Sequence, residues 1–247
     1  MRTQRSKKSL WRGIPGFILI LPLLLCANLV DVSHAATITA DMVALDQFLT
    51  FNRMGAVNPT GMIFALRRDV VEHNPGSASD GLTEAEGGTL APGKVRLRDD
   101  KRPRPIVLRA NEGDTLTISF QNLLNPSVPS GSDPVSGIVI DEQPVTRSAG
   151  VHVQGLQLVG SIDSDGSNVG RNTSSLAAPG ESKTYSLYAE KENAYVLNST
   201  ATNSGGEGMS GSIAFGLFGM VNVEPAGAVW YRSQLTEAEL NMATTGH

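Results

Sequence analysis

The chain has 247 residues, of which 40% are hydrophobic, 18% charged and 5% aromatic, and it contains 26 glycines and 13 prolines. This balance is typical of a turn-rich globular protein and excludes disorder throughout and a collagen-like repeat. The formal charge is −4, and because the first 35 residues contain five basic residues against Asp31 alone, the remainder carries about −8. A chain this acidic is not expected to bind nucleic acid or an anionic membrane surface.

The first 35 residues have the organisation of an export signal. A basic start precedes the apolar residues 14–25 (IPGFILILPLLL), and Ser33 and Ala35 place small residues before a cleavage point at Ala36. The apolar stretch is short for a membrane span and is interrupted by proline. We therefore predict a Sec-type signal peptide over residues 1–35, a periplasmic or secreted protein, and no membrane span after signal cleavage.

Cys26 is the only cysteine, and it lies within the predicted signal. A chain that begins at Ala36 therefore contains no thiol. This excludes disulfides, a thiolate nucleophile, zinc–cysteine sites and any copper site that needs a cysteine sulfur.

Residues 36–93 are predicted to form an N-terminal extension and a polar loop. The apolar residues 43–71 are broken by two glycines and a proline, which favours short strands, and we expect these to lie along a sheet edge. The following residues, 72–93, contain few large apolar side chains, which is typical of a surface loop.

Residues 94–226 have the pattern of a β-rich domain. Residues 114–122 (DTLTISFQN) alternate apolar and polar side chains, as a strand with one buried face does. Many short strands separated by turn residues indicate a β-sandwich or small barrel. The tail, residues 227–247, has a helical pattern over 233–244, which predicts a short C-terminal helix. The other strand-like runs are residues 94–98, 104–108, 150–158, 183–188, 195–199 and 218–224.

Six short motifs follow one another in a fixed order along residues 109–225. They are RANEGDTLTI (109–118), GVHVQG (150–155), Asp165-Gly166, Pro179-Gly180-Glu181, Tyr185 and GLFGMVNVEP (216–225). In this order they resemble the N-terminal cupredoxin (plastocyanin-like) domain of multicopper oxidases. The resemblance implies an all-β, cupredoxin-like Greek-key β-sandwich exported to an oxidising compartment.

The resemblance also implies where copper ligands would lie. In that family four His-x-His pairs hold a three-copper cluster, and two of these pairs belong to the first domain. Here the first pair is replaced by His152 and Gln154, and the second pair by Asn198 and Thr200. Amides and hydroxyls are poor copper ligands. His152 is therefore the single candidate metal ligand of an incomplete site, and the other three are degenerate copper-motif positions.

A lone histidine on an apolar strand also has a purely structural interpretation. Such a side chain is usually half-buried and hydrogen-bonded to a neighbour, for which Gln154 and Asn198 are the candidates. No catalytic or cofactor-binding residue is assigned in the chain. No cofactor is expected, although copper at His152 stays open as an alternative.

These observations predict an exported cupredoxin-like domain without catalytic copper that acts as a structural or interaction module, with a truncated oxidase as one possible origin. We expect no enzymatic activity from this chain alone, although the family consists of oxidoreductases. Two alternatives stay open. One is a subunit of a split copper-dependent oxidoreductase, and the other is a weak copper-binding protein that uses His152, Met209, Met220 or His247.

The expected partners are further cupredoxin domains or a second copy of the chain. A sheet face that packs on a neighbouring domain in a larger protein would be uncovered here. We expect Leu217, Phe218 and Trp230 to be exposed on that face and to favour association.

Two further patterns have competing interpretations. Residues 163–168 (DSDGSN) are similar to a calcium loop, but they lack the glycine and glutamate positions of an EF-hand, so we predict a turn. Residues 67–104 contain a cluster of arginines and lysines with interspersed aspartates. We predict a solvated, ion-paired surface there in preference to an anion-binding patch.

Overall fold

The computed structural model describes residues 35–127, 143–144, 146–167, 171, 173–202 and 209–229. These residues form β-strands, and the helical segments among them are three-residue 3-10 turns. Within this described part, no helix is long and apolar enough to cross a membrane. Residues 1–34 of the predicted signal peptide, the predicted helix over 233–244, Trp230 and His247 lie outside the described residues.

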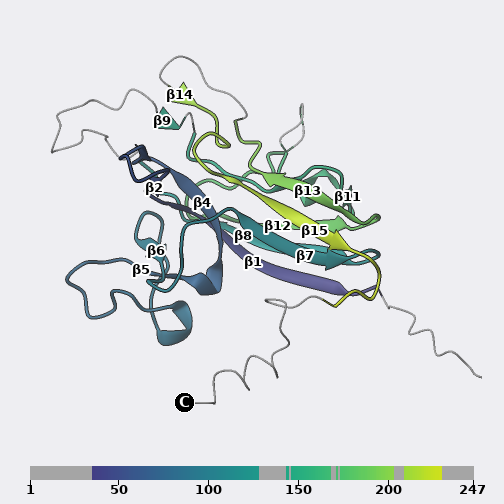
Figure 1. The fold of residues 1–247 in the computed structure, drawn as a ribbon, viewed down its shortest axis with the longest axis horizontal. Helices are drawn as coiled ribbons and strands as arrows, with labels where there is room; N and C mark the ends of the chain where they lie inside the picture. Colours follow the sequence, from purple (N-terminus) through teal and green to yellow (C-terminus); the bar gives the residue numbers. More distant parts are fainter. Residues whose placement is uncertain are drawn as a thin grey trace, which may run out of the picture. The chain divides into compact units, whose positions relative to one another are not determined.

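The larger sheet has five strands in the order β11-β12-β8-β1-β4 (Figure 1). β1 (Thr37–Asp46) is parallel to β8 (Thr115–Asn122) on one side and antiparallel to β4 (Met62–Leu66) on the other. β12 (Ser182–Tyr188) pairs with the far side of β8, and β11 (Gln157–Leu158) forms the edge next to it.

The smaller sheet has four strands in the order β10-β13-β15-β7. They are β10 (His152–Val153), β13 (Asn193–Asn198), β15 (Phe218–Glu224) and β7 (Ile106–Asn111). β15 and β7 are parallel, and the other pairs are antiparallel. Because β7 and β8 are consecutive but belong to different sheets, as are β12 and β13, the chain crosses between two layers. The predicted all-β sandwich is confirmed.

Short pairs of strands and three turns complete the described fold. The pairs are β2 (Leu49–Thr50) with β3 (Val57–Asn58), β5 (Val70–Glu72) with β6 (Val95–Leu97), and β9 (Gln143–Pro144) with β14 (Met209–Ser210). The turns are η1 (Arg67–Asp69), η2 (Glu84–Glu86) and η3 (Ile162–Ser164).

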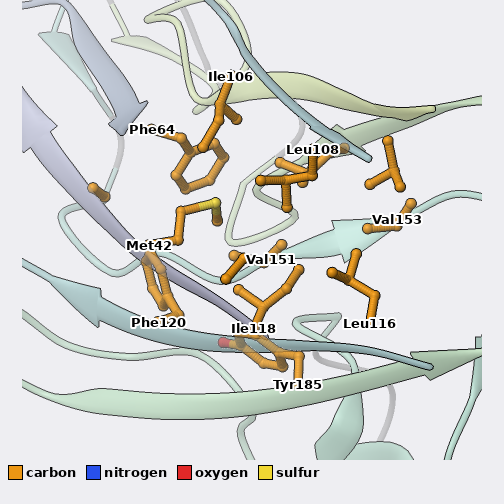
Figure 2. Close-up of a cluster of buried hydrophobic side chains, with 14 of the residues drawn as sticks. Met42, Phe64, Ile106, Leu108, Leu116, Ile118, Phe120, Val151, Val153 and Tyr185 are labelled. Atoms are coloured by element: carbon orange, nitrogen blue, oxygen red, sulfur yellow. The ribbon is translucent and has the colours of Figure 1, made fainter. Parts of the chain in front are cut away.

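The two sheets enclose the main hydrophobic core (Figure 2). Alternate residues of β8, namely Leu116, Ile118 and Phe120, are buried in it as predicted. The ring of Phe120 meets Phe64 edge-on at a centroid distance of 6.0 Å, and it is tilted by 36° to the ring of Tyr185 at 6.2 Å. Aromatic contacts of this geometry add stabilisation beyond the burial of apolar area.

The second half of β1, residues 42–45, is buried on both faces. Met42 and Ala44 face the main core, whereas Val43 and Leu45 belong to a second cluster. That cluster is covered by residues from the following segment, including Leu90 and Val95. The segment predicted to lie along a sheet edge therefore supplies an edge strand, β4, and an interior strand, β1. The reason is the continuous apolar run at 42–45, because a strand with two covered faces does not alternate.

The run at 150–158 was expected to form one strand, and this prediction is wrong. The structure divides it into β10 and β11, which belong to different sheets. Gly155 has φ +102°, and a Cβ there would lie 2.7 Å from the ring of Tyr195. A glycine is required in this left-handed conformation, and it turns the chain from one sheet to the other.

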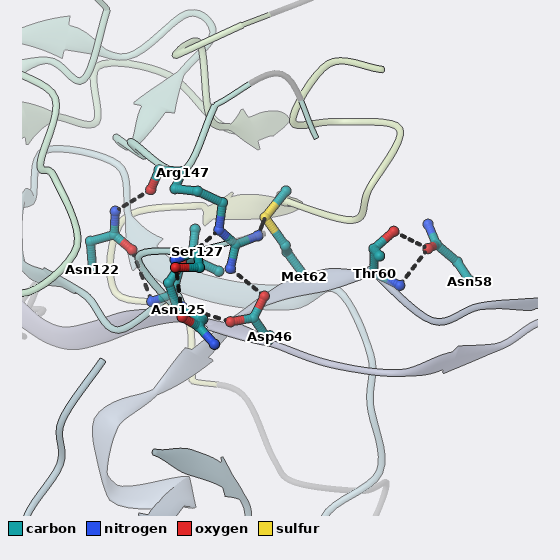
Figure 3. A network of polar contacts seen from close by, with 9 residues as sticks. Asp46, Asn58, Thr60, Met62, Asn122, Asn125, Ser127 and Arg147 are labelled. Carbon is teal, nitrogen blue, oxygen red and sulfur yellow. Dashed lines mark hydrogen bonds and ion pairs between the residues drawn. The ribbon is translucent and has the colours of Figure 1, made fainter. Parts of the chain in front are cut away.

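A buried polar network joins the ends of three segments (Figure 3). Arg147 is 8% exposed, forms an ion pair with Asp46 at the end of β1, and donates from Nε to the carbonyl of Asn125 at 2.8 Å. Asn122 at the end of β8 donates to the carbonyls of Arg147 and Ala177, each at 2.8 Å. The network fixes residue 147, and with it the chain that leads into β10.

We predict that Arg147→Met lowers the free energy of unfolding by about 3 kcal/mol, because it leaves the Asp46 carboxylate without its buried partner. The exposed pair Arg109–Glu224 provides the control, and Arg109→Met is expected to cost at most about 1 kcal/mol. Urea unfolding of both variants measures the difference. Equal costs would contradict the structural role of the network.

Candidate functional site

The copper-motif positions meet at one end of the smaller sheet. His152 of β10 lies directly opposite Asn198 of β13, so both side chains point to the same face. The neighbouring Val153 and Leu197 are buried in the core, which places this face on the outside of the sandwich. The backbone N–H of Gln154 donates to the backbone carbonyl of Val196 at 2.9 Å, which continues the pairing of the two strands by one residue.

His152 is held by a buried carboxylate. Its Nδ1 lies 2.7 and 2.9 Å from the two carboxylate oxygens of Asp165, which directly follows η3. The side chain of Asp165 is 7% exposed and that of His152 is 27% exposed. Burial raises the pKa of Asp165, but hydrogen bonds from His152 and Ser167 outweigh it and hold this pKa below its ordinary value. A carboxylate at Nδ1 keeps the proton on that nitrogen, so a neutral imidazole has its lone pair on Nε2.

Two glycines make the contact between Asp165 and His152 possible. The amide of Gly166 donates to the carbonyl of Val151 at 2.8 Å, and a Cβ on Gly166 would lie 2.2 Å from the Val151 nitrogen. A Cβ on Gly150 would lie 2.7 Å from the carbonyl oxygen of Gly166. Backbone packs directly on backbone, and no side chain fits between the Asp165 loop and β10.

The other three copper-motif positions form hydrogen bonds of their own. Gln154 Nε2 donates to Asn198 Oδ1 at 3.5 Å, and Asn198 Nδ2 donates to the carbonyl of Ser199 at 3.3 Å. Thr200 Oγ1 donates to the carbonyl of Gly166 at 2.9 Å. Gln154 is exposed, whereas Asn198 is 2% exposed. These side chains make a polar wall beside His152.

The prediction that Gln154 or Asn198 is the hydrogen-bond partner of His152 is wrong. Gln154 and Asn198 were the candidates, but they bond to each other, and Asp165 holds the imidazole. Asp165 was visible in the sequence as part of the Asp165-Gly166 motif. A pairing across thirteen residues that depends on two glycines has no local pattern in the sequence.

The donor set does not fit a copper cluster. Copper sites in proteins are built from several imidazole, thiolate or thioether ligands. Among the described residues, no group of three or more His, Cys, Asp or Glu side chains is placed to hold a metal ion. His152 provides one imidazole, and the amides and hydroxyl beside it are weak donors. At most, its Nε2 could occupy one position in a coordination sphere completed from elsewhere.

The two remaining sequence patterns are structural. Asp163 is exposed while Asp165 is buried against His152, so their carboxylates do not converge, and the predicted turn is η3. The basic cluster is an ion-paired surface, as predicted, with pairs at Arg67–Glu84 (2.7 Å), Arg98–Asp100 (3.1 Å) and Lys101–Asp69 (3.4 Å).

The outer face of the smaller sheet carries a row of exposed apolar side chains. Val107, Val196, Phe218 and Met220 are 48%, 49%, 39% and 36% exposed. Val196 is paired with Met220 in β15, and Met220 with Val107 in β7, so these three are neighbours across three strands. Phe218 lies opposite Asn198, which places the row next to the polar wall. We call these four residues the apolar face.

The expected exposure of this region is confirmed at Phe218 and wrong at Leu217. Leu217 is fully buried in the main core. The chain enters β15 through Gly216, which has φ +109° and lies against the carbonyl of Met62. This turn directs Leu217 inward and leaves Phe218 outside.

Comparisons with known proteins give matches only among solved structures. No protein-family model matches the chain, and no curated protein matches it. Similar structures include a multi-copper oxidase from Pseudomonas thermotolerans, with 19% identity, TM-score 0.44, and coverage of 80% of this chain and 32% of that one. The multicopper oxidase mgLAC has 15% identity and a TM-score of 0.40, and the match covers 79% of this chain and 41% of that one. A copper nitrite reductase from Nitrosomonas europaea has 15% identity and a TM-score of 0.39, and the match covers 79% of this chain and 45% of that one. The chain spans less than half the length of each of these three proteins.

The pair of Asp165 and His152 predicts a pH dependence of stability. The pKa of Asp165 is lowered in the folded state. Its contribution is therefore fully present above the pKa of an unfolded aspartate, about 3.9, and is lost as the pH falls through the lower folded value. The free energy of unfolding of the wild type, measured with a chelator present, should fall relative to Asp165→Asn as the pH decreases through this window. Asp163→Asn is the exposed control, and parallel curves for wild type and Asp165→Asn would contradict the prediction.

Proposed function

We propose that this chain is an exported, cupredoxin-like module related to the first domain of multicopper oxidases, and that it acts by packing on another protein surface. It does not catalyse copper-dependent oxidation by itself. The observation that carries the proposal is the composition of the outer face of the smaller sheet. There the apolar face lies beside a site that has one imidazole where the family has four.

The placement of the motifs supports the relationship. The RANEGDTLTI motif covers the end of β7 and the start of β8, and GLFGMVNVEP contains β15. Tyr185 is buried in the main core, and its hydroxyl donates to the carbonyl of Ser175 at 2.7 Å. Asp165-Gly166 lies against GVHVQG through the contact with His152. The motifs that are far apart in the sequence thus meet in one sandwich.

The apolar face supports an interaction role. Its four side chains project from neighbouring strands, away from the core, and form a contiguous patch and not scattered single residues. Contiguous exposed apolar surface of this kind marks sites of protein association. The partner we propose is a further cupredoxin domain or a second copy of this chain.

We predict that the processed chain self-associates with rising concentration and that the double substitution Phe218→Ser, Met220→Ser abolishes this by removing apolar area from the contact. Sedimentation velocity over a concentration series measures it. Phe51→Ser is the matched control, because Phe51 is 64% exposed and lies outside the apolar face. A monodisperse monomer at high concentration would overturn self-association, and equal effects of both substitutions would overturn the assignment of this face.

One observation favours a second function, copper binding by His152 within a split oxidoreductase or a weak copper-binding protein. Histidines that bind metals usually donate their second ring nitrogen to a carboxylate, and Asp165 accepts from His152 in this way. In this arrangement Nε2 is the ring nitrogen of His152 whose lone pair could coordinate a metal ion. The remaining ligands would have to come from another polypeptide.

Copper content distinguishes the two functions. We expect less than about 0.1 copper per chain in the protein expressed with added copper, because one imidazole does not retain the metal. His152→Ala should leave this value unchanged. The control is His73→Ala, whose imidazole lies 3.3 Å from Asp80 at the surface. Stoichiometric copper that is lost in His152→Ala and kept in His73→Ala would overturn the copper-free module and establish the second function.

A further inference from the structure

The backbone nitrogen of Ala36 contacts a buried carboxylate. It donates to Asp114 Oδ1 at 2.8 Å, and the backbone N–H of Asn111 donates to Asp114 Oδ2 at 2.8 Å. Asp114 is 4% exposed and lies in the turn between β7 and β8. None of the ion pairs found in the described residues includes it. Two backbone hydrogen bonds stabilise this buried carboxylate, and a positive charge at the same position would stabilise it further.

The predicted signal cleavage creates a positive charge at the same nitrogen. Hydrolysis of the Ala35–Ala36 peptide bond consumes one water, leaves a carboxylate on Ala35 and converts the Ala36 amide into a primary amine. An α-amine is mostly protonated near neutral pH, where it carries one positive charge. Ala35 and Ala36 are both exposed, and β1 begins at the next residue, Thr37.

Ala36 is held in place independently of this charge. The amide of Thr115 donates to its carbonyl oxygen at 2.8 Å. The parallel pairing of β1 with β8 starts immediately afterwards, at Thr37 opposite Thr115. The nitrogen of Ala36 therefore stays at Asp114 whether or not a residue precedes it.

We propose that the Ala35–Ala36 bond is the processing site and that Asp114 binds the α-ammonium that processing releases. This rests on the export signal that is part of the proposed function. The neutral amide of the precursor already donates to an ionised carboxylate, and the positive charge of the ammonium adds Coulombic attraction to that hydrogen bond. Removal of the signal thus strengthens the contact that starts the β1–β8 pairing, so the mature chain is more stable than the precursor.

The first test identifies the mature N-terminus. The full-length chain is expressed with export to the periplasm, and the intact mass and N-terminal sequence of the product are determined. The expected first residue is Ala36. Any other first residue overturns the assignment of the processing site.

The second test measures the ion pair without export. Chains that begin at Ala36 and at Ala35 are prepared with Asp114 intact and with Asp114→Asn. With Asp114 intact, the additional residue should raise the unfolding equilibrium constant by about tenfold, because it replaces the ammonium with a neutral amide. With Asp114→Asn, the two chains should agree within about twofold. Equal stability with Asp114 intact, or the same loss in both backgrounds, overturns the ion pair.

A third comparison tests the ion pair without the Asp114→Asn variant, in case that variant does not fold. Enzymatic acetylation of the α-amine of the Ala36 chain removes the charge and leaves every side chain in place. It should produce the same loss of stability as the additional residue, and acetylation without effect overturns the proposal. These stability measurements need neither copper nor a partner, so their outcome is independent of the association and copper tests.

Discussion

The ion pair between the buried Arg147 and the half-buried Asp46 is the constraint on which the placement of the candidate site depends. It joins the end of β1 to the segment that leads into β10, and Asn122 fastens the same segment to the end of β8. The ends of β1 and β8 in the larger sheet thereby fix the position of β10, the edge strand of the smaller sheet. Because His152 begins β10, its position relative to the core depends on these polar contacts as well as on the short pairing of β10 with β13.

The outer face of the smaller sheet combines two properties that normally belong to different proteins. Its polar end has a histidine oriented by a carboxylate, and the described residues around it offer no group of three or more His, Cys, Asp or Glu side chains that could hold a metal ion. Its apolar end has side chains suited to a dry contact with another surface. A partner that covers the apolar face would also lie beside His152, so binding of a partner and completion of a metal site are geometrically compatible.

Local patterns in the sequence were sufficient where burial alternates. The alternation in β8 and the apolar run of β15 were located correctly from residues 114–122 and 218–224. They were insufficient where structure depends on distant partners. The interior position of β1 follows from parallel pairing with β8, about eighty residues away, and from cover by Leu90 and Val95. The family resemblance predicted four copper-motif positions, but it could not identify Asp165 as the partner of His152, because that contact needs the backbone approach at Gly150 and Gly166.

The direct backbone contact between Gly166 and Val151 separates what can change in this site from what cannot. Gln154 projects from the surface, so replacing it leaves the packing of the sandwich intact. A methyl group at residue 150 or 166 would force two segments apart and unseat the core residue Val151. Exposed positions beside His152 can therefore vary one at a time, whereas the two glycines that hold the Asp165 loop against the start of β10 cannot.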